Sequence, residues 1–361
     1  MMPADKNAPD GRDVCQIVID HACELIAESG VRATTLRAVG QRSGINFSTI
    51  AQLFGSKEEL IAACFQRTVL RDHERTDALM AEAGPDFGSV DHIANYLWAI
   101  CEEAAGHRRR ETIVLAELLV HGAEQPRLDA IAAAWIEQRR QRIESMLGRD
   151  RAHQRSSIIT RVLIAESIFM AACHSSARYR IEARSAFAAA LVRLIEAPLR
   201  GEEASANTAA SEVAVPPTRT GRSGSAREGI VDATADLIAE RGLDAVTNRS
   251  VAARAKVSLA LTTYHFASLS ALRFEGIELL ATRLLDHPMP TAPTIARGIV
   301  EVLLACARGG LPSDHALALW RHRVVLSETP HAVSDPDCLQ LGANCFAAWD
   351  FGEALTELLR V

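Results

Sequence analysis

Apolar residues recur at intervals of three and four positions along most of the chain. Val14, Val18, Ala22 and Leu25 form one such series. This spacing places apolar side chains on one face of an α-helix. The sequence has no clear run of alternating apolar and polar residues and no Asn-Gly dipeptide, which would indicate strands and tight hairpins. The pattern therefore predicts an all-α fold.

One stretch interrupts the helical pattern. Residues 199–225 read LRGEEASANTAASEVAVPPTRTGRSGS, with mostly small and polar side chains, a Pro-Pro pair and three glycines. Such a composition cannot bury enough apolar surface to offset the entropy lost on ordering. We therefore predict that this stretch is a linker.

The chain contains an internal repeat. Residues 20–60 align without a gap on residues 232–272 at a constant offset of 212, and 14 of the 41 pairs are identical. Repetition of this kind indicates two copies of one structural module. The identical pairs include Glu28/Glu240, Gly30/Gly242, Thr35/Thr247, Arg37/Arg249, Arg42/Arg254 and Phe54/Phe266.

The first half of the repeated module reads as two helices. An amphipathic helix from about residue 12 to residue 29 should end at Gly30, because glycine readily takes the left-handed conformation that ends helices. Thr35 is suited to cap the N-terminus of a short second helix that extends to about Arg42, since its hydroxyl can accept a hydrogen bond from a free backbone N–H.

The second half of the module reads as a turn and two more helices. Gly44-Ile45-Asn46 predicts a tight turn, in which Asn46 caps the helix 47–54. Ser56 then opens a long fourth helix, with Glu59 three positions later as in a capping box. Two short helices joined by a three-residue turn with glycine have the geometry of a helix-turn-helix.

The distribution of charge supports contact with nucleic acid at this motif. The chain is acidic overall, with a net charge of −6. Nevertheless residues 29–57 and residues 245–274 contain basic side chains and no Asp or Glu. Because a phosphate backbone repels carboxylates, the absence of acids from the same window in both copies predicts two DNA-facing surfaces.

Both copies of the repeated module resemble a known family of proteins. Residues 17–60, IVIDHACELIAESGVRATTLRAVGQRSGINFSTIAQLFGSKEEL, and residues 230–272, with the segment TTYHF, resemble DNA-binding domains of TetR-family transcriptional regulators. The resemblance implies two modules, each with a three-helix DNA-binding domain followed by a helical ligand-binding and dimerisation body. The expected domains are 12–72 and 73–198 for the first module, 199–225 for the linker, and 226–285 and a shortened 286–361 for the second.

The resemblance also implies which residues of the first copy face DNA. Gln52 is the groove-facing side chain that can make a bidentate contact to adenine. Phosphate-binding residues fix the protein on the duplex without specifying its sequence. The groove-facing positions are Phe47, Ser48, Ala51 and Gln52, and the phosphate-binding positions are Thr35, Arg37, Asn46, Thr49 and Lys57.

The same transfer gives a second set of candidates in the second copy. The groove-facing positions are Leu259, Ala260, Thr263, Tyr264 and His265, and the phosphate-binding positions are Thr247, Arg249 and Ser258. For Phe47 and Leu259, packing against the first helix of the module is the alternative to contact with DNA.

Several positions depart from the family pattern. Family members usually have glycine at the position of Ser48 and an aromatic residue at that of Ala51. In the second copy Lys256 replaces the usual glycine, Leu261 the usual threonine and Leu269 the usual lysine. Each exchange weakens the expectation that the second copy binds DNA at full strength.

Residues with other chemistry are scattered. Cys15 and Cys23 lie about 12 Å apart along a helix, too far for a disulfide. His315 and His322 lack the spacing of a helical metal pair, so no metal is expected, and the run 108–110 of three arginines reads as a solvated or capping helix start. Candidate effector-lining residues are Tyr96, Trp98, Trp135, Phe169 and Tyr179.

Composition narrows the class of protein. No apolar run is long enough to cross a bilayer, and the polar N-terminal residues do not resemble a signal peptide. Eight cysteines without CxxC pairs fit reduced thiols, so we expect a cytoplasmic protein. Phosphate-binding loops, GxSxG and HExxH are missing from the sequence, so we expect neither an enzyme nor a cofactor.

Together these patterns predict a sequence-specific regulator of transcription, a ligand-responsive repressor that binds double-stranded operator DNA through two reading modules. The effector class cannot be read from the sequence. The two modules are expected to pair as an intramolecular pseudo-dimer, with a homodimer as the other arrangement. In the alternative function, one module reads DNA while a degenerate second module serves dimerisation or binds another protein.

Overall fold

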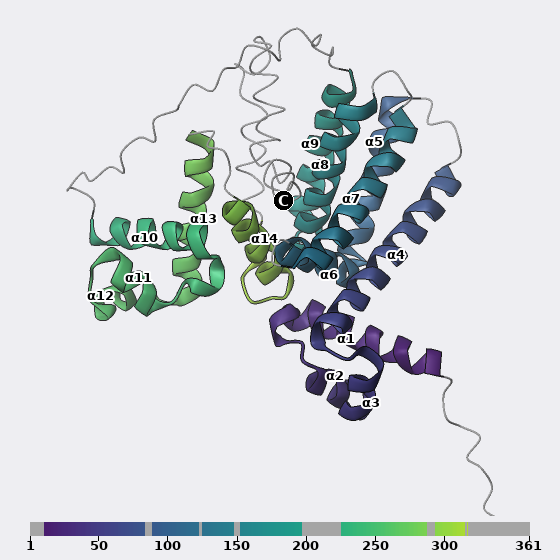
Figure 1. Cartoon of the computed structure of the whole chain (residues 1–361). Coiled ribbons are helices and arrows are strands. Elements are labelled where there is room, and N and C mark those ends of the chain that lie inside the picture. The colour runs from purple at the N-terminus through teal and green to yellow at the C-terminus, as the bar shows by residue number, and fades with distance from the viewer. Residues whose placement is uncertain are drawn as a thin grey trace, which may run out of the picture.

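The computed structural model describes residues 11–83, 89–122, 125–147, 152–196, 225–286, 293–314 and 316. Within these residues all regular structure is helical, as the sequence predicts (Figure 1). The first module comprises α1 (Gly11–Ala33), α2 (Leu36–Ser43), α3 (Phe47–Phe54), α4 (Lys57–Ala83), α5 (Val90–Ala105), α6 (Arg109–Gly122), α7 (Pro126–Leu147), α8 (Ala152–Ala172) and α9 (Ala177–Glu196). The second comprises α10 (Ala226–Arg241), the short 3-10 helix η3 (Leu243–Ala245), α11 (Asn248–Ala255), α12 (Leu259–His265), α13 (Leu269–Asp286) and α14 (Pro293–Ala307).

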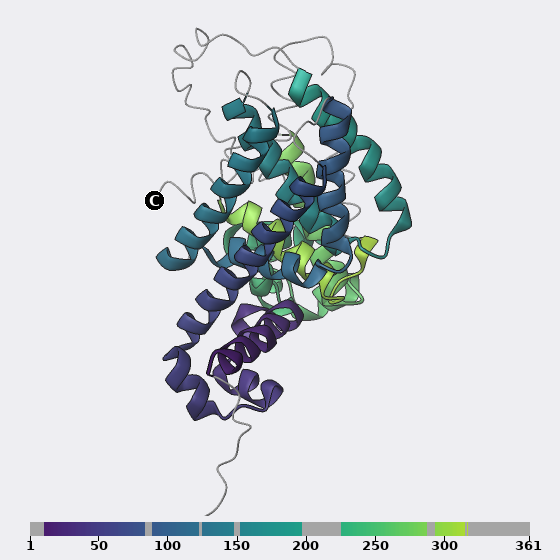
Figure 2. The same cartoon turned by 90° about the vertical axis from the view of Figure 1, so that its right-hand side faces the viewer.

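Helices α1 to α3 and the beginning of α4 form a small domain with its own apolar core. Val18, Ile26, Val39, Ile50 and Phe65 are fully buried within it. Burial of branched and aromatic side chains contributes about 1.5–3 kcal/mol each, which lets such short helices remain folded. Figures 1 and 2 show this domain at one end of the molecule, with α4 leading from it into the bundle α5–α9.

A single helix connects the DNA-binding domain to the helical body. α4 extends without interruption from Lys57 to Ala83, so the expected domain boundary after residue 72 falls inside it. α4 therefore belongs both to the small domain and to the helical body.

The second module repeats the small domain. α10 to α13 follow the order of α1 to α4, and Ile230, Ile238, Val251 and Leu272 are buried in the corresponding core. Ser225 caps α10 in a reciprocal capping box with Glu228. The remainder of the expected linker lies outside the described residues, as does most of the expected domain 286–361.

Helix α14 lies between the two modules. It contacts α10 of the second module and also α6 and α8 of the first, which Figure 1 shows as a helix placed between the green domain and the teal body. α13 ends at Asp286 and α14 begins at Pro293, which leaves no room for a counterpart of the 16-residue α5. No helix in the described part of the chain is long and apolar enough to cross a membrane.

Candidate nucleic-acid interface

The first helix-turn-helix is set by a cap and a left-handed turn residue. The side chain of Thr35 accepts a hydrogen bond from the N–H of Ala38 at 3.1 Å and so starts α2. Gly44 ends α2 with a φ of 72°. Asn46 occupies the N-cap position of α3 as expected, but its side chain makes no capping hydrogen bond, which corrects that part of the prediction.

Helix α3 presents one face to solvent. Ile50 is fully buried beneath it, whereas the exposed fraction of Phe47 is 54% and Ser48 and Gln52 are also exposed. About half of the Phe47 side chain is therefore open to solvent and available for contact with DNA. Thr49 and Ala51 are half-buried at the sides of the helix.

The second helix-turn-helix is capped at both of its helices. Thr247 and Ser250 cap α11 reciprocally, and Ser258 caps α12 by accepting the N–H of Leu261 at 3.2 Å. Leu259 is 49% exposed and Tyr264 is 82% exposed, so a large part of each side chain is open to solvent. Ala260 and Thr263 are exposed beside them, and His265 is half-buried, with its ring edge against that of Tyr264.

The turn of the second domain is strained. Lys256 stands where the first domain has Gly44 and adopts a φ of 56°, the one positive value among non-glycine residues in the described part of the chain. A side chain in this region costs about 1–2 kcal/mol relative to the ordinary helical region. The departure noted in the sequence therefore affects the stability of the turn and leaves its shape intact.

Two arginines of the basic windows are already paired within the protein. Arg42 binds Glu28 through two hydrogen bonds of 2.5 and 2.7 Å, and Arg254 binds Glu240 in the same way. These pairs hold the second helix of each domain to the first. The charge of each window that is left for phosphate is consequently smaller than the sequence suggests.

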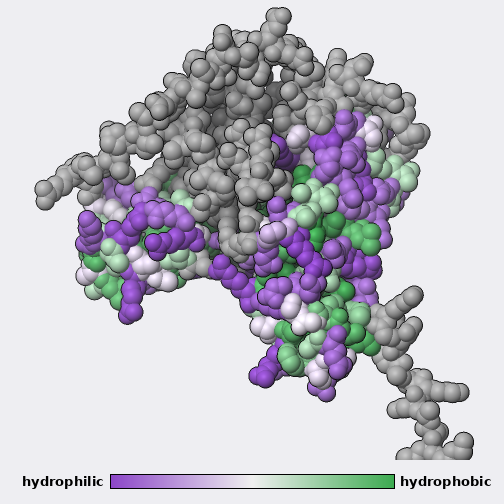
Figure 3. All heavy atoms as spheres, in the orientation of Figure 1, coloured by the Kyte–Doolittle hydropathy of each residue, from purple (hydrophilic) through white to green (hydrophobic). Residues whose placement is uncertain are grey.

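Other basic residues of the windows remain at the surface. Arg37 and Arg249 are exposed at equivalent places in α2 and α11. The ammonium group of Lys57 donates to the carbonyl of Arg32 at 3.1 Å, and Arg273 donates in a similar way to the carbonyl of Val246 at 3.0 Å. In Figure 3 hydrophilic and hydrophobic residues are mixed on the visible surface of both small domains.

Comparison with protein families agrees with this geometry. The family of bacterial regulatory proteins of the TetR type matches residues 18–64 and again residues 230–275. The chain carries two TetR-type DNA-binding domains in tandem. Each match covers a helix-turn-helix and the helices that flank it.

Two solved structures are similar to the chain. A transcriptional regulator from Rhodococcus sp. Rha1 is 21% identical, with a TM-score of 0.41, and the match covers 50% of this chain and 93% of that one. The multidrug binding protein EbrR complexed with imidazole is 19% identical, with a TM-score of 0.40, and the match covers 55% and 100% respectively. No curated protein matches the chain significantly.

Beside its TetR-type DNA-binding domain, the first module contains a cavity in the helical body. The cavity is small and partly open to solvent, and α4 to α8 contribute to its wall. Its wall combines apolar side chains, among them Ile100, Leu115 and Ile168, with charged ones from α4, α7 and the turn before α6. A mostly apolar wall with a few placed polar groups is the usual composition of a small-molecule site.

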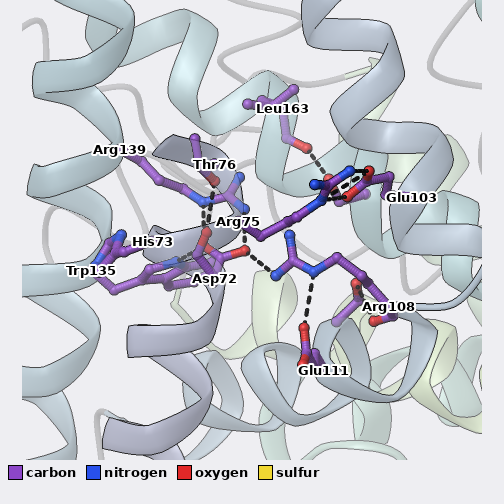
Figure 4. A network of polar contacts seen from close by, with 12 residues as sticks. Asp72, His73, Arg75, Thr76, Glu103, Arg108, Glu111, Trp135, Arg139 and Leu163 are labelled. Carbon is purple, nitrogen blue, oxygen red and sulfur yellow. Dashed lines mark hydrogen bonds and ion pairs between the residues drawn. The ribbon is translucent and has the colours of Figure 1, made fainter. Parts of the chain in front are cut away.

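A buried carboxylate organises the polar wall of this cavity. Asp72 accepts hydrogen bonds of 2.8–3.0 Å from Arg108, Arg139 and the indole N–H of Trp135 (Figure 4). Burial alone would raise the pKa of Asp72, but the two guanidinium groups and the indole hold it well below its usual value. The carboxylate therefore stays charged and fixes the two arginines at the cavity.

Only one of the five residues predicted from the sequence to line an effector site lies at this cavity. Trp135 lines it, whereas Tyr96, Trp98, Phe169 and Tyr179 are buried elsewhere and are not among its lining residues. Trp98 packs on Phe187, and the hydroxyl of Tyr179 donates to Glu166 at 2.5 Å. The charged residues were missed because Asp72, Arg108 and Arg139 come from separate helices.

The sequence predicts that residues 108–110 form a solvated or capping helix start. α6 does begin at Arg109, but two of the three arginine side chains are not solvated. Arg108 is buried against Asp72, and the partly buried Arg109 donates to the carbonyls of Ala171 and Ala307. Arg110 is exposed.

The thiols of Cys23 and Cys64 form hydrogen bonds between α1 and α4. The thiol of Cys23 in α1 donates to the backbone carbonyl of Cys64 in α4 at 3.8 Å, and the thiol of Cys64 donates to the carbonyl of Ile19 at 3.8 Å. All described cysteines are free thiols. His315 and His322 lie outside the described residues.

Proposed function

We propose that this chain is a sequence-specific transcriptional regulator, a repressor that binds double-stranded operator DNA in the cytoplasm and responds to a small molecule. The proposal is carried by one observation: each TetR-type domain presents an exposed recognition helix within a segment that has no acidic residue. Removal of carboxylates lets such a surface approach phosphate, and exposed side chains of a recognition helix can reach base edges. The proposal involves no enzymatic step.

We propose that both modules read DNA. Phe47 and Gln52 in α3, and Leu259 and Tyr264 in α12, extend from equivalent places. Because these residues differ in type at each position, the two helices cannot prefer the same bases. The operator should therefore contain two unlike half-sites. The caps and turn of the second domain are intact, which favours this proposal over a degenerate second module that serves only dimerisation or protein binding.

The two modules should pair within one chain. α14 of the second module lies against α6 and α8 of the first, and tethering raises the effective concentration of one module near the other to about the millimolar range. Light scattering of the free protein should give a mass near the 39.1 kDa of a single chain. A mass twice as large would favour the homodimer instead.

The effector should bind in the cavity around Asp72. This cavity is lined mainly by apolar side chains, together with Asp72 and the guanidinium groups of Arg108 and Arg139, and Arg108 also donates to Glu111 at 2.9 Å. The proposed ligand is small and mostly apolar, with an acidic group that would replace Glu111 as a partner of Arg108. Calorimetric titration with a panel of aromatic and aliphatic carboxylic acids, and with the matching amines as controls, tests this preference. Binding of the amines alone would contradict it.

Selection of bound duplexes from a random pool tests the central proposal. We expect two unlike half-sites about 34–36 Å apart, and affinity that falls steeply with salt because phosphate contacts release counterions. A perfectly symmetric operator would contradict two different readers. A single half-site would favour the degenerate second module, and affinity that does not change with salt would contradict DNA binding of this kind.

A further inference from the structure

A carboxylate holds the end of the first helix in each DNA-binding domain. Glu117 of α6 accepts the N–H of Val31 at 3.2 Å, and Glu301 of α14 accepts the N–H of Leu243 at 2.9 Å. Val31 and Leu243 lie at the common offset of 212. Helix α14 therefore has the same place on the second domain that α6 has on the first.

The glycine before each of these amides lets the carboxylate approach. Gly30 has φ 83° and ψ 166°, and Gly242 has φ 79° and ψ 175°, a conformation that is essentially restricted to glycine. A Cβ atom at Gly30 would lie 3.2 Å from an oxygen of Glu117, and one at Gly242 would lie 2.5 Å from an oxygen of Glu301. Displacement of α6 or α14 consequently acts directly on the end of α1 or α10.

The two supporting helices are joined to each other by arginines. Arg308, directly after α14, donates to Glu117 at 2.5 Å and to the carbonyls of Ile26 and Ala27 at 3.0 Å. In return Arg109 at the beginning of α6 donates to the carbonyl of Ala307 at the end of α14. Glu117 is thus bound to the first DNA-binding domain and to the second module at once.

This joint is shielded from water. The exposed fractions of the side chains are 6% for Glu117 and 18% for Arg308. Burial would raise the pKa of Glu117, but His121, Arg308 and the N–H of Val31 keep it below the usual value. A buried carboxylate in an ion pair of this kind resists separation, because loss of one partner leaves an unpaired charge away from water.

The same helix also forms a wall of the cavity. Thr112, Leu115 and Ala116 of α6 line it, and Ala116 is the immediate neighbour of Glu117. All lining residues belong to the first module, from α4 to α8 or the turn before α6. A ligand that moves α6 by the 1–2 Å typical of helix shifts would therefore move Glu117 with it.

We propose that this one cavity controls both DNA-binding domains, the second through Glu117, Arg308 and α14. The inference rests on the proposed response to a small molecule. Its consequence is that α14 is supported by the body of the first module. The two domains then shift together when the cavity is occupied.

Hydrogen exchange measured by mass spectrometry tests this coupling without effector or DNA. Ser167→Leu adds volume to the cavity from α8 and stands in for an occupant, and peptides that contain Val31 and Leu243 report on the two domains. We expect exchange of both peptides to rise about fivefold or more, within the usual range of coupling between sites. In the double variant with Arg308→Gln the response of the Leu243 peptide should be reduced relative to that of the Val31 peptide, because of the two arginines only Arg109 then still joins α6 to α14. Arg178→Gln, which removes an exposed arginine of α9, is the matched control and should keep both responses.

A Leu243 peptide that does not respond to Ser167→Leu, or that responds equally with Arg308→Gln, would overturn the proposal. Leu115→Ala changes the same cavity by removing volume, and provides the test if Ser167→Leu does not fold. Binding to the selected operator separates this result from the proposed function. A chain that binds no DNA but shows the exchange pattern would refute the regulator and retain the coupling, whereas the reverse result would retain the regulator alone.

Discussion

The ion pair between the first two helices is the same in both DNA-binding domains, whereas the recognition helices share almost nothing. Arg42 with Glu28 and Arg254 with Glu240 are identical residues in identical contacts. By contrast, Gln52 in the first domain corresponds to Tyr264 in the second. The comparison teaches that residues in contacts between helices are retained in both copies, because the packing of the domain depends on them. Exposed residues of the recognition helices are free to differ.

The two modules differ more strongly beyond the small domains. α4 of the first module carries Asp72 into a buried cluster with two arginines, whereas the sequence has Leu284 at the same offset in the second module. The second module instead places α14 against the first body. One copy therefore supplies both the cavity and the support for its partner.

The largest effect should come from this buried cluster. Asp72→Asn leaves two buried guanidinium groups without a full counter-charge and should lower the free energy of unfolding by about 3–5 kcal/mol. Asp77→Asn on the same helix, where the carboxylate is 58% exposed, should cost about 1 kcal/mol or less. Urea denaturation measures both. An equal loss of unfolding free energy in the two variants would show that the buried cluster around Asp72 does not stabilise the first module more than an exposed ion pair does.

The recognition helices provide the next comparison. Gln52→Ala should cost about 1–3 kcal/mol at a single base pair of one half-site, because it removes hydrogen bonds to a base edge. Tyr264→Ala should act at the other half-site only. Binding to operators with one substituted base pair at a time measures both effects. If Tyr264→Ala leaves affinity and footprint unchanged, the second domain is not a reader.

The turn residues should respond with opposite signs. Gly44→Ala forces a side chain into a positive φ and should destabilise the protein by about 1 kcal/mol, whereas Lys256→Gly should stabilise it by a similar amount or less. A Cβ atom at Gly44 would meet no atom of the described residues within 4 Å apart from its chain neighbours, so crowding does not confuse the comparison. Thermal unfolding checks both signs, and a stabilising Gly44→Ala would contradict the assignment.

The stability of the protein should depend on pH through His73, the neighbour of Asp72 in α4. Burial and the charge of Arg142 lower the pKa of His73 to about 4. Below the ordinary pKa of about 6.5 the unfolded chain binds a proton that the folded protein does not, so stability should fall as the pH drops from 6.5 towards 4, by at most about 1.4 kcal/mol per unit. His73→Gln should flatten this part of the unfolding profile. An unchanged slope would assign the effect to other groups.

The smallest effects should separate scaffold arginines from DNA-facing ones. Arg37→Ala and Arg249→Ala should each reduce the slope of log affinity against log salt by about one, because each loses a phosphate contact. Arg42→Ala and Arg254→Ala should leave that slope unchanged, because both side chains already bind carboxylates. A reduced slope for these two would mean that the ion pairs open on DNA.

The local elements could largely be predicted from the sequence. The recognition helix 47–54 and the Thr35 cap agree with the structure, because capping residues and apolar spacing act over a few positions. The Asn46 capping bond was the exception. The domain boundary after residue 72 could not be placed from such signals, since nothing in the local pattern shows that α4 continues through it.

The sequence by itself therefore determined the repeat and the short helices of the helix-turn-helix, because these depend on short-range spacing and on an offset that can be counted. Only the tertiary structure decided which charges are available. It joined Arg42 to Glu28, drew Asp72, Arg108 and Arg139 into one cavity and placed Arg308 on Glu117. Such contacts connect residues far apart in the chain, and a buried charge can settle only where the fold brings it a partner.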